Sequence, residues 1–139
     1  MKSDFQDAHT RHTHDAGLLF EQSRWANADH LYGVAAECGL KALMQAFGME
    51  INPQTDAPAK REDRDHINAI WARFESYRTG HHAGTEYALS SENPFENWTI
   101  SQRYAGQASF NEAIAATHKS GCNSVAELVK KARTEGLLP

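Results

Sequence analysis

Apolar side chains recur every three or four residues along most of the chain, which is the period of an amphipathic α-helix. This pattern predicts one helix over residues 3–22 and a second over residues 24–47. In the second segment apolar residues occupy several adjacent stripes along the helix surface, which is typical of a helix buried on most of its sides. A further apolar stripe predicts a third helix, with Asp63 as its N-terminal cap and its end near Gly80.

The rest of the chain is less regular. Residues 49–63 contain two prolines and predict a loop, and residues 81–106 form a longer non-periodic segment of the kind that is often functional. Two shorter helices are predicted over 107–119 and 124–133, separated by a Ser-Gly break. No segment has the period of a β-strand. We therefore predict an all-α, up-and-down bundle of about five helices, with residues 1–139 as one domain.

Large apolar side chains are sparse, which bears on how the bundle is stabilised. Leu, Ile, Val and Phe together account for 23 of 139 residues, whereas alanine occurs 21 times. Alanines let helices pack closely but bury little area each. Because the formal net charge is only -4, the chain does not have the high charge typical of disordered proteins. We expect a second copy to complete this lean core, so that the protein is a homodimer.

Charge and cysteine content argue against several classes of protein. A pI near 6.0 disfavours sequence-independent binding of long nucleic acid, which depends on neutralising phosphates, although it allows a local basic site. Cys38 and Cys122 are too few for a disulfide framework. The N-terminal residues are too polar for a secretory signal, and no apolar run approaches the ~18 residues that span a bilayer. We expect a cytoplasmic protein that does not enter a membrane.

Charged residues inside the apolar second helix are one candidate site. Glu37 and Lys41 are four residues apart, with the acid first, which is the favourable order for a helical ion pair. Both lie in the most apolar segment, where a partly buried charge needs a partner. They are interpreted either as a structural or interface pair or as contacts to a ligand bound in the bundle.

Two arginine and histidine pairs have the composition that metal-free ribonuclease chemistry needs, a cation for the phosphate and a histidine that transfers a proton near neutral pH. Arg61 lies in a predicted loop and His66 in the first helical turn after it, where free backbone N–H groups favour a phosphate. Arg24 and His30 converge only if Arg24 precedes the helix. With eight arginines and eight histidines in the chain, such spacings also arise by chance.

Aromatic residues beside an arginine form a candidate site in the long loop. Trp98, Arg103 and Tyr104 have the chemistry to stack on a base and neutralise a phosphate. The alternative is that the aromatic rings close the end of the bundle while Arg103 stays solvated. Because the residues are predicted in a loop rather than on a helix face, a functional role carries as much weight as the structural one.

The histidines raise a less favoured alternative, a metal-binding helical bundle. His9 and His12 share a face of the first predicted helix, and bundles can build metal sites from such residues. The chain has no Glu-x-x-His pair, however, and its two cysteines are far apart. We therefore predict no metal site and no cofactor.

The segment ADHLYGVAAECGLKALM, residues 28–44, resembles the second helix of HEPN domains, in which an alanine-rich stretch runs through a glutamate to a Leu-Lys-Ala-Leu box. The preceding helix, the mid-chain DHINAIWARF and the late WTISQRYAGQASFNEA fit the same layout. The resemblance implies a small all-α bundle that commonly dimerises. It also implies either a metal-independent RNase of a toxin–antitoxin or defence system, often paired with a nucleotidyltransferase, or a non-catalytic RNA- or nucleotide-binding module.

Active HEPN domains have an arginine, a short spacer that begins with a polar residue, and then a histidine, usually near the last long helix. Arg61 and His66 follow this pattern at an earlier helix, whereas Arg103 meets no histidine before His118. We predict an HEPN-like domain that binds RNA or a nucleotide-like ligand. If it cleaves RNA, Arg61 holds the phosphate and His66 transfers the proton.

Arg24 and His30 are the second choice for these two roles. The alternative function is that of a non-catalytic dimeric interaction protein, whose charged residues only fix how two helices pair.

Overall fold

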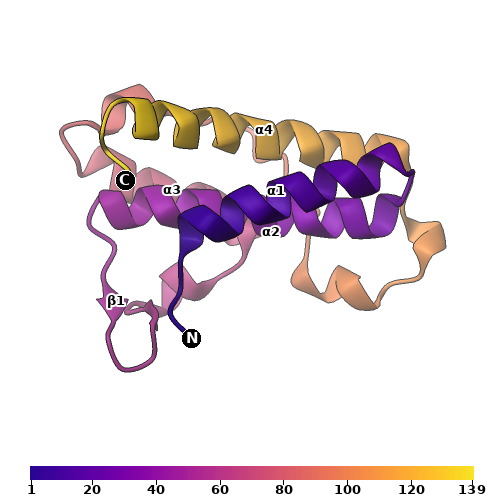
Figure 1. Cartoon of the computed structure of the whole chain (residues 1–139), viewed down its shortest axis with the longest axis horizontal. Helices are drawn as coiled ribbons and strands as arrows, with labels where there is room; N and C mark the ends of the chain where they lie inside the picture. Colours follow the sequence, from indigo (N-terminus) through magenta and orange to yellow (C-terminus); the bar gives the residue numbers. More distant parts are fainter.

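The computed structural model describes residues 1–139 and confirms the all-α architecture (Figure 1). Its four α-helices are α1 (Phe5–Glu21), α2 (Trp25–Ala46), α3 (Ile67–Thr79) and α4 (Glu112–Thr134). The connections contain a two-stranded hairpin, β1 (Ile51–Asn52) and β2 (Ala57–Pro58), and four short 3-10 helices: η1 (Arg61–Arg64), η2 (Gly84–Tyr87), η3 (Ile100–Tyr104) and η4 (Gln107–Ser109). None of the helices has the length and hydropathy that crossing a membrane requires.

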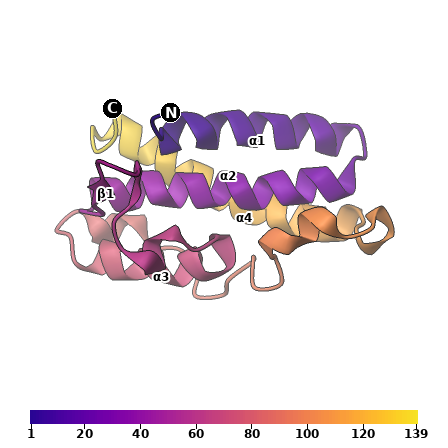
Figure 2. The ribbon, with the colours of Figure 1, turned by 90° about the horizontal axis from the view of Figure 1, so that it is seen from below.

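Helix α2 is the centre of the bundle, as its apolar stripes predict. Figure 2 shows it between α1 on one side and α3 with the connecting loops on the other. Helix α4 packs along it as well. A Cβ on Gly39 would come within 2.6 Å of Val125 and 2.7 Å of His9, so the missing side chain at Gly39 lets α1, α2 and α4 approach closely.

The prediction of two short helices at the C-terminal end is wrong, because α4 is one continuous helix of 23 residues. It begins after Asn111, whose side chain accepts a hydrogen bond from the backbone N–H of Ile114 at 2.9 Å. Gly121, which suggested a break, lies within the helix. A Cβ there would be 2.7 Å from the ring of Phe95, so this glycine provides space for the loop that packs on α4.

The predicted capping role of Asp63 is also wrong. Asp63 lies in η1 and is buried, and its carboxylate accepts hydrogen bonds from Arg73 Nε at 2.7 Å and from the Tyr77 hydroxyl. Helix α3 begins at Ile67, with His66 in the capping position and no hydrogen bond from its side chain to the helix end. Asp63 therefore fastens the segment before α3 onto the middle of that helix.

The two predicted loops contain more regular structure than their composition indicates. Residues 49–63 include the antiparallel hairpin, in which Ile51 pairs with Pro58 and Asn52 with Ala57. The Ser3 hydroxyl donates to the Asp56 carbonyl at 2.8 Å, which ties the N-terminus to this hairpin. Residues 81–106 include η2 and η3, and the second of these helices forms part of the pocket described next.

Candidate functional site

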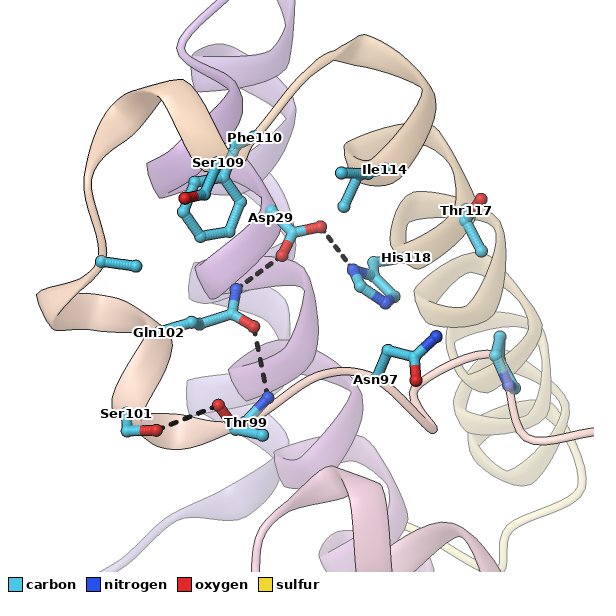
Figure 3. Close-up of a pocket in the computed structure, with 12 residues that line it drawn as sticks. Asp29, Asn97, Thr99, Ser101, Gln102, Ser109, Phe110, Ile114, Thr117 and His118 are labelled. Atoms are coloured by element: carbon cyan, nitrogen blue, oxygen red, sulfur yellow. Dashed lines mark hydrogen bonds and ion pairs between the residues drawn. The ribbon is translucent and has the colours of Figure 1, made fainter.

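A pocket of about 560 Å³ lies between α2, α4 and the long connection that joins α3 to α4 (Figure 3). Asp29 of α2 and His118 of α4 contribute to its polar side, together with Asn97 and Gln102 from the connection. Phe110 lies on its apolar side. The volume is within the range of small-molecule and cofactor pockets, roughly 300–1,000 Å³.

The carboxylate of Asp29 is fully buried and joins the three elements that form the pocket. Oδ1 accepts a hydrogen bond from Nδ1 of His118, and Oδ2 accepts one from Nε2 of Gln102 at 2.6 Å. The backbone carbonyl of Asp29 accepts a third from the indole N–H of Trp98 at 3.2 Å. Both carboxylate oxygens are thus used inside the protein.

The amide orientation of Gln102 follows from its second contact. Its Oε1 accepts a hydrogen bond from the backbone N–H of Thr99 at 3.2 Å, so the NH₂ group must face Asp29. The Thr99 side chain in turn accepts from the backbone of Gln102, forming a capping box at the start of η3. This arrangement fixes η3 against the buried carboxylate.

The imidazole of His118 is held on two sides and open on a third. Its ring stacks on Phe95 with centroids 5.2 Å apart and 11° between the planes. Because Asp29 accepts, Nδ1 carries the proton, and Nε2 of the neutral ring is an acceptor. Nε2 has no partner in the protein and is not sealed from solvent, and Figure 3 draws it on the side of the ring away from Asp29. An oriented imidazole with a free Nε2 is the arrangement of a general base.

The predicted ion pair of α2 is present and has a third member. Lys41 Nζ lies 3.0 Å from Glu37 Oε2, and Nδ1 of His66 lies 2.9 Å from Glu37 Oε1. The side chain of Lys41 is 6% exposed, whereas that of His66 is 43% exposed. The ion pair of Glu37 with Lys41 and the histidine His66, which the sequence indicates as separate candidates, are thus in contact through Glu37. Arg61, the predicted phosphate contact, is exposed in η1 and makes no side-chain hydrogen bond or ion pair with His66.

Arg24 does precede its helix, as the pairing with His30 requires, since it occupies the N-terminal cap position of α2. No hydrogen bond joins the two side chains, however. The His30 ring instead stacks on Trp98, with centroids 5.6 Å apart, and its Nδ1 is buried without a partner. Burial, followed by the positive charge of Arg103, lowers the pKa of His30.

The three candidates in the long loop divide into a buried and an exposed group. Trp98 is fully buried against α2, so in this conformation neither face of its indole is open to a base. Arg103 lies over the ring of Tyr104 at 4.8 Å, and Tyr104 is 78% exposed. These two residues lie between Gln102 and Ala105, which both line the pocket.

The histidines of the first helix do not gather into one cluster. His9 is buried, and its Nδ1 donates to the carbonyl of Ala35 at 2.8 Å, whereas His14 is exposed. No group of three or more His, Cys, Asp or Glu side chains is arranged to hold a metal ion. The metal-binding alternative therefore gains no support from the structure.

Sequence reasoning missed Asp29, Gln102 and His118 as parts of one site. One signal was available for the histidine: His118 falls on the helical stripe that includes Ala115, Cys122 and Val125, all of them buried. A titratable residue on an apolar face requires a buried partner. The identity of that partner is set by the fold.

Comparison with protein-family models, with curated proteins and with solved structures finds no match to this chain. Membership of the HEPN family therefore stays a prediction, and the pocket is the observation from which a function can be inferred.

Proposed function

We propose that the protein is an HEPN-like domain that binds RNA or a nucleotide-like ligand at the pocket over Asp29 and His118, and that it cleaves RNA as a metal-independent endoribonuclease. The observation that supports this proposal is the Asp29–His118 pair, with Nε2 free at a pocket large enough for one nucleotide unit. This differs from the prediction made from spacing alone, which assigned proton transfer to His66.

The reaction follows from the groups that face the pocket. Nε2 of His118 takes the proton of a ribose 2′-hydroxyl, and the 2′-oxygen forms a bond to the adjacent phosphorus. The bond from phosphorus to the 5′-oxygen breaks, and that oxygen receives a proton from the imidazolium or from water. The products are a 2′,3′-cyclic phosphate and a 5′-hydroxyl. Asp29 stabilises the imidazolium, and Arg103, which follows Gln102 in η3, offers a cation to the phosphate.

The experiment is cleavage of a defined RNA by the purified protein in excess chelator, with analysis of the fragment ends. We expect 2′,3′-cyclic phosphate ends from the wild type and a rate at least ~100-fold lower from His118→Gln, as expected when a general base is lost. His14→Gln is the matched control because His14 is exposed and has no side-chain hydrogen bond, and it should cleave like the wild type. Unchanged cleavage by His118→Gln would show that this histidine is not the base.

Glu37 and His66 are a second candidate centre, because they form the same carboxylate and imidazole arrangement at 2.9 Å on a more exposed surface. The same assay separates the two centres. Loss of cleavage in His66→Gln, with full activity in His118→Gln, assigns the reaction to Glu37 and His66. If the wild type neither cleaves RNA nor binds a short single strand, the proposed function is wrong.

A homodimer and a nucleotidyltransferase partner in a toxin–antitoxin or defence system belong to the same proposal. Light scattering of the purified chain tests the first of these. A homodimer has twice the 15.5 kDa mass of one chain, and a mass of 15.5 kDa at all concentrations would contradict it. Co-purification of a nucleotidyltransferase encoded beside this chain tests the second.

A further inference from the structure

The pocket contains two side-chain amides, but only one of them is free to bind a ligand. Both ends of the Gln102 amide are used, one by Asp29 and the other by the backbone of Thr99. Asn97 also lines the pocket, is exposed, and makes no hydrogen bond through its side chain. Figure 3 shows its amide projecting from the loop on the same side of the cavity as His118. Asn97 therefore presents one unused donor and one unused acceptor to an incoming molecule.

The charge of the pocket indicates which part of a nucleotide enters it. None of its lining residues is a lysine or an arginine, and the carboxylate of Asp29 lies at its base. A phosphate in the cavity would therefore meet an anion and no cation. Arg103, the one cationic residue of η3, is not among the residues that line the pocket. This arrangement favours an uncharged group inside and phosphates at the rim.

The opposite side of the pocket is apolar. Two large hydrophobic residues, Phe110 and Ile114, line this side of the cavity and remain partly exposed. Phe110 is half-buried, and Ile114 is 38% exposed. The pocket thus has an apolar side, formed by Phe110 and Ile114, and the free amide of Asn97. A flat ring with polar atoms along one edge fits such a site. Unstacked bases of single-stranded RNA are recognised by proteins in this way, through a stacking side chain and hydrogen bonds to the base edge.

On the basis of the proposed function, we propose that the pocket takes one unpaired nucleobase of RNA, which lies against Phe110 while Asn97 pairs with its edge. The phosphates stay at the rim, where the 2′-hydroxyl of the same nucleotide reaches Nε2 of His118. Each of the four bases has a donor next to an acceptor on its pairing edge. An asparagine amide can turn to match any of them. The pocket is therefore tolerant of base identity.

An aspartate in place of Asn97 would offer acceptors only. Guanine alone has two adjacent donors on its pairing edge, N1–H and the 2-amino group. The substitution Asn97→Asp should therefore convert a tolerant pocket into one that prefers guanine. Because the Asn97 side chain is exposed and has no partner in the protein, the substitution leaves the fold intact.

The experiment is calorimetric titration of the full chain with short oligouridylates that lack 2′-hydroxyl groups, so that they are not cleaved, and in which one central base is uracil, adenine, cytosine or guanine. For the wild type we expect similar affinities for the four strands. For Asn97→Asp we expect a preference of about tenfold for the guanine strand, the typical discrimination of one bidentate pair. Phe110→Ala should weaken binding of all four strands by a similar factor.

Asn123→Asp is the matched control. Asn123 is exposed on α4, makes no side-chain hydrogen bond and does not line the pocket, so this variant adds the same charge elsewhere. It should keep the wild-type ratios of affinity among the four strands. If Asn97→Asp binds with the same affinity ratios as the wild type, base recognition by Asn97 is overturned and the proposed function stands. Absence of binding to every strand by the wild type overturns both.

Discussion

The indole of Trp98 occupies the space that a side chain on Gly33 would need. A Cβ at position 33 would overlap the five- and six-membered rings of the indole. This close approach brings the indole N–H to the carbonyl of Asp29, one turn earlier on α2. The bare backbone at Gly33 is thus a condition for docking the long loop, and with it Gln102, onto the buried carboxylate.

Substitution Gly33→Ala should destabilise the protein by about 1–3 kcal/mol, the usual cost of overpacking, although alanine is the better helix former. The matched control is Gly17→Ala in α1, where a Cβ would meet nothing within 4 Å. That variant should gain about 0.5–1 kcal/mol. Urea unfolding followed by circular dichroism measures both. A stability gain in both variants would contradict the observed packing of Trp98.

Acid should destabilise the fold through His9. Burial lowers the pKa of His9, and the smaller opposing effect of its hydrogen bond to Ala35 does not restore it. The unfolded chain, with a histidine pKa near 6.5, then takes up protons before the folded chain does. Stability is therefore complete above that value and decreases as the pH falls below it.

Substitution His9→Gln should make the stability of the protein less dependent on pH between 7.5 and 5, as measured by thermal unfolding at each pH. Some dependence remains because burial also lowers the pKa of His12 and His30. His14→Gln, at an exposed position, should keep the wild-type slope. Equal slopes in all three proteins would show that His9 does not contribute.

Both cysteines should resist alkylation while the protein is folded. Burial raises the pKa of Cys38 to about 12 and that of Cys122 to about 11. The thiolate is the reactive form, so very little of either side chain reacts at neutral pH. Mass spectrometry after iodoacetamide treatment should show no label in buffer and two labels in urea. Labelling in buffer at the rate of a free thiol would contradict the raised pKa of these two thiols.

The hydrogen bond from Tyr77 to Asp63 should contribute measurably to stability. Asp63 is 1% exposed, and removal of the hydroxyl leaves the buried carboxylate with Arg73 as its remaining side-chain donor. We expect Tyr77→Phe to cost about 1.5–3 kcal/mol in urea unfolding, as for other hydrogen bonds to charged groups. Tyr104→Phe, at a residue that is 78% exposed, should change stability little. Equal effects would mean that the Tyr77 hydroxyl is solvated.

The spacing of apolar residues predicted the first two helices well. The first two helices begin and end within about two residues of the predicted positions, because apolar stripes and their interruptions are visible in the sequence. The prediction failed at Gly121, where a glycine was interpreted as a helix end. In the structure it provides space for Phe95, a residue of a distant loop, and no local signal contains that information.

The candidate site was less predictable because its members are far apart in the chain. Asp29 and His118 are separated by 89 residues, and Asp29 and Gln102 by 73. A sequence motif relates residues a few positions apart and therefore cannot reveal such pairs. Glu37 and His66 show the same limit: each was singled out, but their contact across 29 residues follows only from the packing of α3 on α2.

The order in which these elements are made has a consequence for when the pocket exists. During synthesis α1 and α2, which pack on each other in the finished fold, emerge before α3 and α4, so Asp29 is present early. Its partners Trp98, Gln102 and His118 all belong to later segments. A nascent chain that ends before α4 has the carboxylate without the imidazole. Any action on RNA that depends on this pocket is therefore absent while the ribosome is still translating the message for the first three helices.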